Sequence, residues 1–113
     1  MRDDWERLLD IQDQIKLIEE DIAAGRKAFD CDRHIRDSLV LRIANIGESC
    51  RAMSEQFRQK HPEIPWKEII GMRSKLMHEY FEIDEKEVWN AGEQDIPKLR
   101  VQIAKLLKAE GKQ

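Results

Sequence analysis

The chain has 113 residues, a formal net charge of −3, and charged side chains at 38% of its positions. This length supports one domain with a modest core, so we expect a single domain over residues 1–113. Few Gly and Pro residues favour long helices, the negative charge excludes a general polyanion binder, and two Cys residues without a Cys/His cluster exclude a disulfide framework and a metal site.

The first ten residues, M-R-D-D-W-E-R-L-L-D, carry acids where a secretory signal needs a basic start and an apolar run. No stretch approaches the ~20 apolar residues of a membrane span, so we expect a soluble cytoplasmic protein with no membrane partner. A helix is predicted from about Asp3 to Ala24, ended by Gly25. Its apolar residues recur every three or four positions: Leu8, Ile11, Ile15, Ile18 and Ile22.

A second helix is predicted after a short basic turn around Arg26 and Lys27, with Asp30 or Asp32 as its cap. If it continues to the end of its apolar seam, it is about 45 Å long. A strip of small and apolar residues, Val40, Ala44 and Gly47, gives it another side, so we expect two neighbours, one of which could belong to another subunit. The main seam consists of Ile35, Leu39, Ile43, Ile46, Cys50, Met53 and Phe57.

The segment H-P-E-I-P at residues 61–65 is the clearest break, and Pro65 suits the first position of a third helix. Asp84 with Glu87 forms an acidic variant of the capping box and predicts a last helix, which Pro97 should kink or restart near Asp95. The inner face of that helix carries Val88, Ile96, Leu99, Ile103 and Leu106. The pattern therefore predicts an all-α fold, an antiparallel bundle of four to five helices.

The third helix, over residues 65–84, carries an arginine on its apolar side. Arg73 lies in the middle of that side and must either pair with an acid or reach solvent at the rim. His78 lies on a different side, above the small residues Gly71 and Ser74, which leave room for another backbone, a second subunit or a substrate. The apolar side consists of Trp66, Ile69, Ile70, Leu76, Met77 and Tyr80.

The string G-M-R-S-K-L-M-H-E-Y-F-E-I-D resembles the signature of the HepT-like branch of the HEPN superfamily, R-x4-H-x-Y. Arg73, His78 and Tyr80 fill its three positions, and the run A-N-I-G-E at residues 44–48 extends the likeness. The resemblance implies a homodimeric HEPN-like helical domain. It also implies an RNase toxin of a type VII HEPN/MNT toxin–antitoxin system, which acts on RNA without a metal or other cofactor.

The resemblance implies that Arg73 and His78 are catalytic and that cleavage leaves a 2′,3′-cyclic phosphate. On a straight helix these two side chains point ~140° apart, so a cleft shared between two subunits is expected to bring them together. Glu48, Ser74 and Lys75 are assigned as supporting residues. Glu48 could hold Arg73 or be a solvated acid, and Lys75, like Lys67, could attract phosphate or be solvated surface.

The resemblance further implies that Tyr80 is the residue to which the partner, a minimal nucleotidyltransferase (MNT) antitoxin, attaches AMP. Two other functions stay open. One is a non-catalytic HEPN-type helical binding module that docks a nucleotidyltransferase and presents its substrate, which the acidic net charge mildly favours. The other is a purely structural dimerisation bundle. The intact triplet of Arg73, His78 and Tyr80 favours the ribonuclease.

Overall fold

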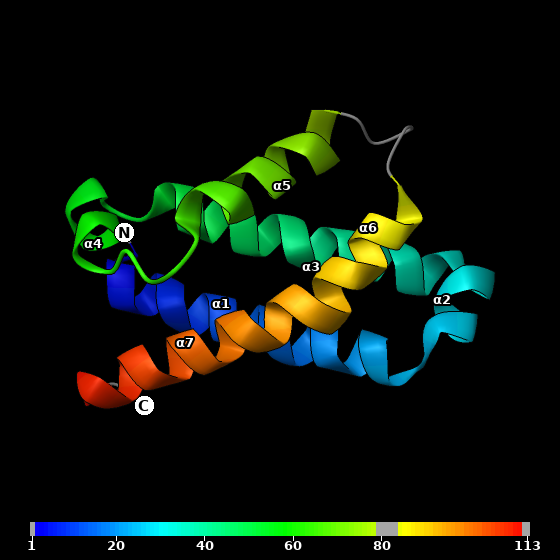
Figure 1. The fold of residues 1–113 in the computed structure, drawn as a ribbon, viewed down its shortest axis with the longest axis horizontal. Coiled ribbons are helices and arrows are strands. Elements are labelled where there is room, and N and C mark those ends of the chain that lie inside the picture. Colours follow the sequence, from blue (N-terminus) through cyan, green and yellow to red (C-terminus); the bar gives the residue numbers. More distant parts are fainter. Residues whose placement is uncertain (1, 79–83, 112–113) are drawn as a thin grey trace.

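The computed structural model describes residues 2–78 and 84–111, and those residues form an all-α fold, as predicted, with no strand among them. Its longer helices run alternately in opposite directions along the molecule (Figure 1): α1 (Asp4–Ala23), α3 (Arg33–Ala52), α5 (Trp66–His78) and α7 (Ile96–Ala109). Shorter elements connect them: α2 (Arg26–Cys31), α4 (Glu55–Lys60), α6 (Glu85–Asn90) and the π-helix η2 (Ala91–Asp95). No helix within the described ranges is long and apolar enough to cross a membrane.

Helix α3 is central, because it packs against α1 on one side and α5 on the other (Figure 1). The predicted apolar seams form the core, although Ile22 and Ile35 at their ends are only partly buried. Burial raises the pKa of the Cys50 thiol to about 12, so this cysteine is protonated and unreactive near neutral pH. The seam residues with little or no exposure are Leu8, Ile11, Ile15, Ile18, Leu39, Ile43, Ile46, Cys50, Val88, Ile96, Leu99, Ile103 and Leu106.

The prediction of one long second helix is wrong, because α3 ends at Ala52 and a new helix begins after Ser54. Ser54 caps α4 by accepting a hydrogen bond from the N–H of Phe57 at 3.2 Å. The Asp4 carboxylate accepts two more, from the Ser54 N–H at 2.9 Å and its hydroxyl at 2.6 Å. The apolar spacing hides this break because Met53 and Phe57, on either side of it, are both buried. With 20 residues, α3 is about 30 Å long rather than 45 Å.

A short helix, α2, occupies the region predicted to be a basic turn. Gly25 ends α1 as predicted and takes a positive φ of 96°, which a residue with a side chain adopts only under strain. The Phe29 side chain is fully buried in the core, and its ring centroid lies 5.2 Å from that of Trp89. Of the two predicted caps, Asp32 begins α3, where its carboxylate accepts a hydrogen bond from His34 N–H at 2.8 Å.

The last predicted helix restarts before Pro97, as expected, since α7 begins at Ile96 directly after η2. Proline lacks the N–H that would continue the preceding helix and is tolerated in a first turn. Asp84 caps α6, but its carboxylate accepts from the Lys86 N–H at 2.9 Å, and the Glu87 N–H donates to the Asp84 backbone carbonyl at 3.0 Å rather than to its side chain. The chain therefore passes from α6 into α7 through a π-helical segment, with right-handed helical backbone angles at both junctions.

Aromatic side chains anchor the start of α5, directly after the predicted break at residues 61–65. Trp66 is buried and its Nε1 donates a hydrogen bond to the carbonyl of His61 at 2.9 Å. The ring of Phe57 lies 6.2 Å from Trp66 and 5.2 Å from Trp5, joining α5 to α4 and α1. Met77, predicted on the apolar side of α5, is 57% exposed, whereas its neighbour Leu76 is buried, because α5 packs mainly on α3.

Helix α5 crosses α3 at Gly47, where the two backbones come unusually close. A Cβ at residue 47 would overlap the Cβ of Arg73 and would lie 3.1 Å from its Cγ and 3.2 Å from the carbonyl oxygen of Ile69. Only glycine fits this crossing. The second side of α3, for which another subunit was one possible neighbour, thus contacts α5 of the same chain at Gly47. That side consists of Val40, Ala44 and Gly47. The homodimer stays a prediction.

We predict that Gly47→Ala lowers the free energy of unfolding by about 1–3 kcal/mol, because overpacking outweighs the ~1 kcal/mol by which Ala is the better helix former. Gly71→Ala is the matched control in α5, since nothing lies within 4 Å of the added Cβ. It should be neutral or stabilising by up to about 1 kcal/mol. Urea unfolding of both variants tests this, and equal stability of the two would contradict the close crossing.

Candidate functional site

Arg73 lies in the middle of α5 with its stem against Gly47 and its guanidinium directed along α3. Its side chain is only 25% exposed. The Nε atom lies 3.0 Å from Oε2 of Glu48, the residue that follows Gly47 on α3. A partly buried guanidinium requires such a counter-charge, because the loss of its hydration is otherwise uncompensated. Gly47, which allows the close approach of α5, and Glu48, which pairs with Arg73 of α5, are therefore adjacent in the sequence.

Glu48 is shared between Arg51 of α3 and Arg73 of α5, and Arg7 of α1 adds a further positive charge. Arg51, one turn further along α3, donates two hydrogen bonds to it, from Nε to Oε2 at 3.1 Å and from Nη2 to Oε1 at 2.7 Å. The Arg51 hydrogen bond, and the positive charges of Arg51, Arg73 and Arg7 of α1, lower the pKa of the Glu48 carboxyl below its usual 4.5 against a smaller opposing effect of desolvation. The same pairing raises the pKa of Arg51. Glu48 is thus ionised at neutral pH.

The structure does not bring His78 to Arg73. His78 is the last residue of α5, is exposed, and forms no hydrogen bond or ion pair with a residue in the described ranges. Between them, Ser74 is partly buried, and Lys75 lies 2.7 Å from Glu87 of α6 through Nζ and Oε2. Tyr80 lies outside the described residues. Among the predicted site residues that the structure describes, Arg73 and Glu48 form an ion pair, and the catalytic roles of Arg73 and His78 remain predictions.

Sequence reasoning missed two arginines of this cluster. Arg51 carried a usable signal, because a residue three positions after Glu48 on a helix lies beside it. Arg7 carried none, since it is far from Glu48 in the sequence and approaches it only because α1 packs on α3. Lys67, considered as a phosphate ligand, is an exposed residue in the first turn of α5.

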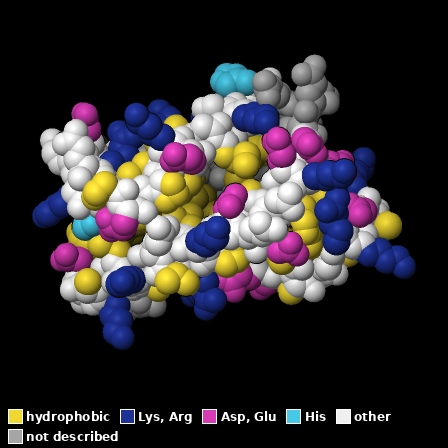
Figure 2. All heavy atoms as spheres, viewed as in Figure 1, with side chains coloured by type: hydrophobic (Ala, Val, Ile, Leu, Met, Phe, Trp, Pro, Cys, Tyr) yellow, Lys and Arg dark blue, Asp and Glu magenta, His cyan; other side chains and the backbone are white. Residues whose placement is uncertain are grey.

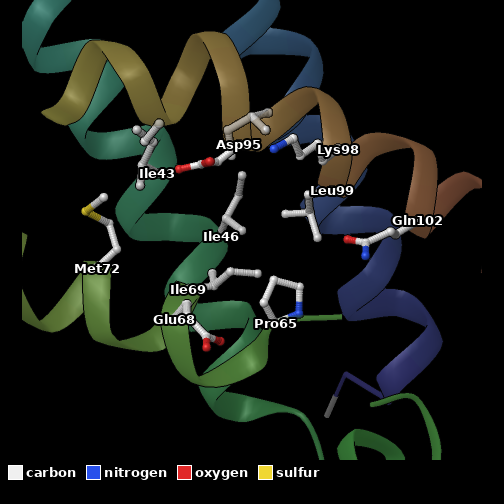
Figure 3. Close-up of a pocket in the computed structure, with 12 residues that line it drawn as sticks. Ile43, Ile46, Pro65, Glu68, Ile69, Met72, Asp95, Lys98, Leu99 and Gln102 are labelled. Atoms are coloured by element: carbon white, nitrogen blue, oxygen red, sulfur yellow. The ribbon is translucent and has the colours of Figure 1, made fainter. Parts of the chain in front are cut away.

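A separate hollow of about 400 Å³ lies between α3, α5, η2 and α7. Figure 2 shows hydrophobic side chains in the middle of this face with charged groups around them. Figure 3 shows the hydrophobic residues Ile46, Ile69 and Leu99 pointing into the hollow, whose rim includes Glu68 and Asp95. None of the lining residues is an arginine or a histidine. The arginine cluster at Glu48, which has the type of donor that phosphate binding requires, is therefore the candidate site.

Among the residues that the structure describes, no three His, Cys, Asp or Glu side chains group closely enough to hold a metal ion. The chemical groups at the candidate site are instead guanidinium donors and one carboxylate. Guanidinium groups bind carboxylate and phosphate oxygens through paired N–H donors, and they stay charged at any ordinary pH. The arrangement can hold an anion and stabilise negative charge that develops on it.

We predict that the stabilisation from Glu48 disappears in acid. Its carboxyl has a lowered pKa in the folded protein, so its contribution is present above about pH 4.5 and is lost as the pH falls through the folded-state value. The effect should be small, since the Glu48 side chain is 44% exposed and its pairs are screened. Urea unfolding of wild type and Glu48→Gln, from neutral pH to about pH 3, should show their difference shrinking toward zero.

Glu20→Gln is the matched control for this titration, because Glu20 is an exposed acid of α1 that pairs with no described residue. Its difference from wild type should stay constant over the same pH range. A Glu48→Gln difference that instead grows as the pH falls would contradict the assignment.

Comparison with known proteins places the chain in a family. The model of the family described as Ribonuclease HepT-like matches residues 11–106, from within α1 to within α7. The chain is 38% identical over 104 residues to the "Probable ribonuclease HepT" of Thermococcus cleftensis, covering 89% of this chain and 93% of the relative. It is 36% identical to a "Putative RNase" of Caldanaerobacter subterraneus subsp. tengcongensis, covering 83% of this chain and 84% of that protein. No solved structure gives a significant match. The chain therefore belongs to the ribonuclease HepT-like family.

Proposed function

We propose that the protein is a ribonuclease toxin of a HEPN/MNT toxin–antitoxin system, with Arg73 and His78 as its catalytic residues. Membership of the HepT-like family and the ribonuclease names of its relatives support the reaction class. The observation that carries the assignment of the site is the Arg73–Glu48 ion pair beside Gly47. It holds a guanidinium in a defined position at the surface of α3, as stabilisation of a phosphate requires.

In the proposed reaction, the His78 imidazole takes the proton from a ribose 2′-hydroxyl. The 2′-oxygen then forms a bond to the adjacent phosphorus, while the bond from phosphorus to the 5′-oxygen of the next nucleotide breaks. Arg73 stabilises the negative charge that develops on the non-bridging oxygens, and water or a second histidine gives a proton to the leaving oxygen. The products are a 2′,3′-cyclic phosphate and a 5′-hydroxyl end. Every proton and charge is handled without a metal ion.

We propose that the cleft combines residues of two chains. Five positions on a helix separate Arg73 from His78 by ~140° of rotation, and within one chain Arg73 is directed to α3 while His78 is exposed. A two-fold dimer with its α5 helices side by side would place the arginine of each chain near the histidine of its partner. The surface beside Gly71, where nothing lies within 4 Å of an added Cβ, leaves room for that approach.

We predict that Arg73→Ala and His78→Ala each reduce RNA cleavage by about 10²- to 10⁴-fold, because each removes a group that acts in the transition state. The rate is measured on a single-stranded RNA with purified protein, and a chelator should leave it unchanged. Arg33→Ala is the control: it removes an exposed arginine from the first residue of α3 and should cleave like wild type.

Mixing the two inactive variants tests the composite cleft. If the arginine and histidine of one cleft come from different chains, a dimer of one Arg73→Ala chain and one His78→Ala chain contains one intact cleft. Cleavage should then return to about a quarter of the wild-type rate, because half of randomly assembled dimers are mixed and each has one of two clefts. No recovery, although the mixed dimer forms, would assign both residues of each cleft to the same chain.

We further propose that Tyr80 is the control point, as the family resemblance implies. Tyr80 follows His78 by two residues and lies outside the described part of the chain. Transfer of AMP to its hydroxyl by an MNT antitoxin would add bulk and negative charge near His78, where an RNA phosphate would otherwise bind. The antitoxin would thus neutralise the toxin through a covalent change of charge.

Tyr80→Phe tests this control, since it removes the acceptor oxygen and keeps the ring. Incubation with the cognate nucleotidyltransferase, ATP and magnesium should add one or more adenylyl groups to the wild type and lower its RNA cleavage. The Phe variant should keep its unmodified mass and remain active beside the antitoxin. An adenylylated and neutralised Phe variant would place the control on another residue.

A further inference from the structure

The two arginines that share Glu48 lie side by side on the surface of α3. The Nε atoms of Arg51 and Arg73 are 3.1 Å and 3.0 Å from the same carboxylate oxygen, Oε2. They are therefore no further apart than about 6.1 Å, the sum of those two distances. Arg51 belongs to α3 and Arg73 to α5, and the Glu48 carboxylate between them is their shared partner.

This cluster is locally positive in a protein with a formal charge of −3. Arg51 and Arg73 both pair with one carboxylate, which leaves these three side chains with a formal charge of +1. RNA attraction in an acidic protein requires such a local excess, because the whole surface repels a polyanion. The cluster supplies the positive patch that the net charge makes necessary.

Arg51 is the member of the cluster most available to a ligand. Its side chain is 56% exposed, against 25% for Arg73. A guanidinium has five N–H donors, and Arg51 gives two to Glu48. The others bond no residue within the described ranges. Arg51 can therefore keep its position on Glu48 and still donate to a second anion.

We propose that Arg51 forms a second phosphate-binding subsite for the RNA backbone, next to Arg73, with Glu48 as the residue that positions both. The inference rests on the proposed function. A polyanion with phosphates at regular intervals suits two neighbouring guanidinium groups better than a single small anion does, since each can take one phosphate. Glu48 acts as an internal counter-ion, which keeps the two positive charges together before RNA arrives.

The test measures binding apart from cleavage, with a fully 2′-O-methylated single-stranded RNA whose blocked 2′-oxygens prevent the reaction. Removal of one phosphate contact should flatten the slope of log Kd against log salt by about 1. Arg51→Ala should therefore raise Kd about fivefold at about 0.15 M salt. The matched control is Arg33→Ala, at the opposite end of the same helix, which should keep the wild-type slope.

Glu48→Gln separates positioning from simple structural support. Loss of the carboxylate frees both arginines from their counter-ion, so the variant should bind the methylated RNA at least as tightly as wild type with a steeper salt slope. Its cleavage of unmodified RNA should fall about tenfold or more, because Arg73 loses its fixed position. A purely structural role for Glu48 would instead lower binding and cleavage together.

An Arg51→Ala variant with wild-type Kd and slope would overturn the subsite, and so would a wild type that does not bind the methylated RNA. These results are distinct from failure of the proposed function. A wild type that binds the methylated RNA with the expected dependence on Arg51 but cleaves no unmodified RNA would leave the subsite in place and refute the ribonuclease.

Discussion

The close crossing of α3 and α5 at Gly47 is the contact on which the candidate site depends. The missing side chain lets the stem of Arg73 occupy the space beside the α3 backbone, and the next residue, Glu48, receives its guanidinium. A side chain at residue 47 would push α5 outward and lengthen the ion pair. Since Coulomb attraction between partly exposed groups weakens quickly with distance and solvent, the arginine would then be free to leave the surface of α3.

That crossing also explains how a small acidic protein can carry a local excess of positive charge. Arg51 of α3 and Arg73 of α5 bond one carboxylate, so their mutual repulsion is reduced while a positive excess remains. Lys75 does not belong to this cluster, because its ammonium pairs with Glu87 across the segment between α5 and α6. The groups that bond Glu48 in the described part of the chain are arginines, whose planar donors suit phosphate oxygens better than a point charge does.

Several errors of prediction share one physical cause, which is that helix caps and tertiary contacts do not change the spacing of apolar residues. Met53 and Phe57 continue the seam of α3 although the helix has ended, because Ser54 and Asp4 together stabilise a new helix start. Met77 has the right spacing for the buried side of α5, yet it is exposed because most of the contact of α5 within this chain is with α3. Periodicity locates a face but does not say how far a neighbour covers it.

The sequence by itself determined the all-α class, the core residues of α1, α3 and α7, and the motif residues Arg73, His78 and Tyr80. It also located the C-terminal end of α1 at Gly25 and the start of α5 at Pro65. These features depend on near neighbours in the chain, where caps, proline geometry and a period of 3.6 residues act. Only the tertiary structure decided that Glu48 pairs with Arg73 rather than being a solvated acid. That pairing depends on where α5 crosses α3, which is set by packing between residues far apart in the sequence and therefore leaves no periodic signal in either helix.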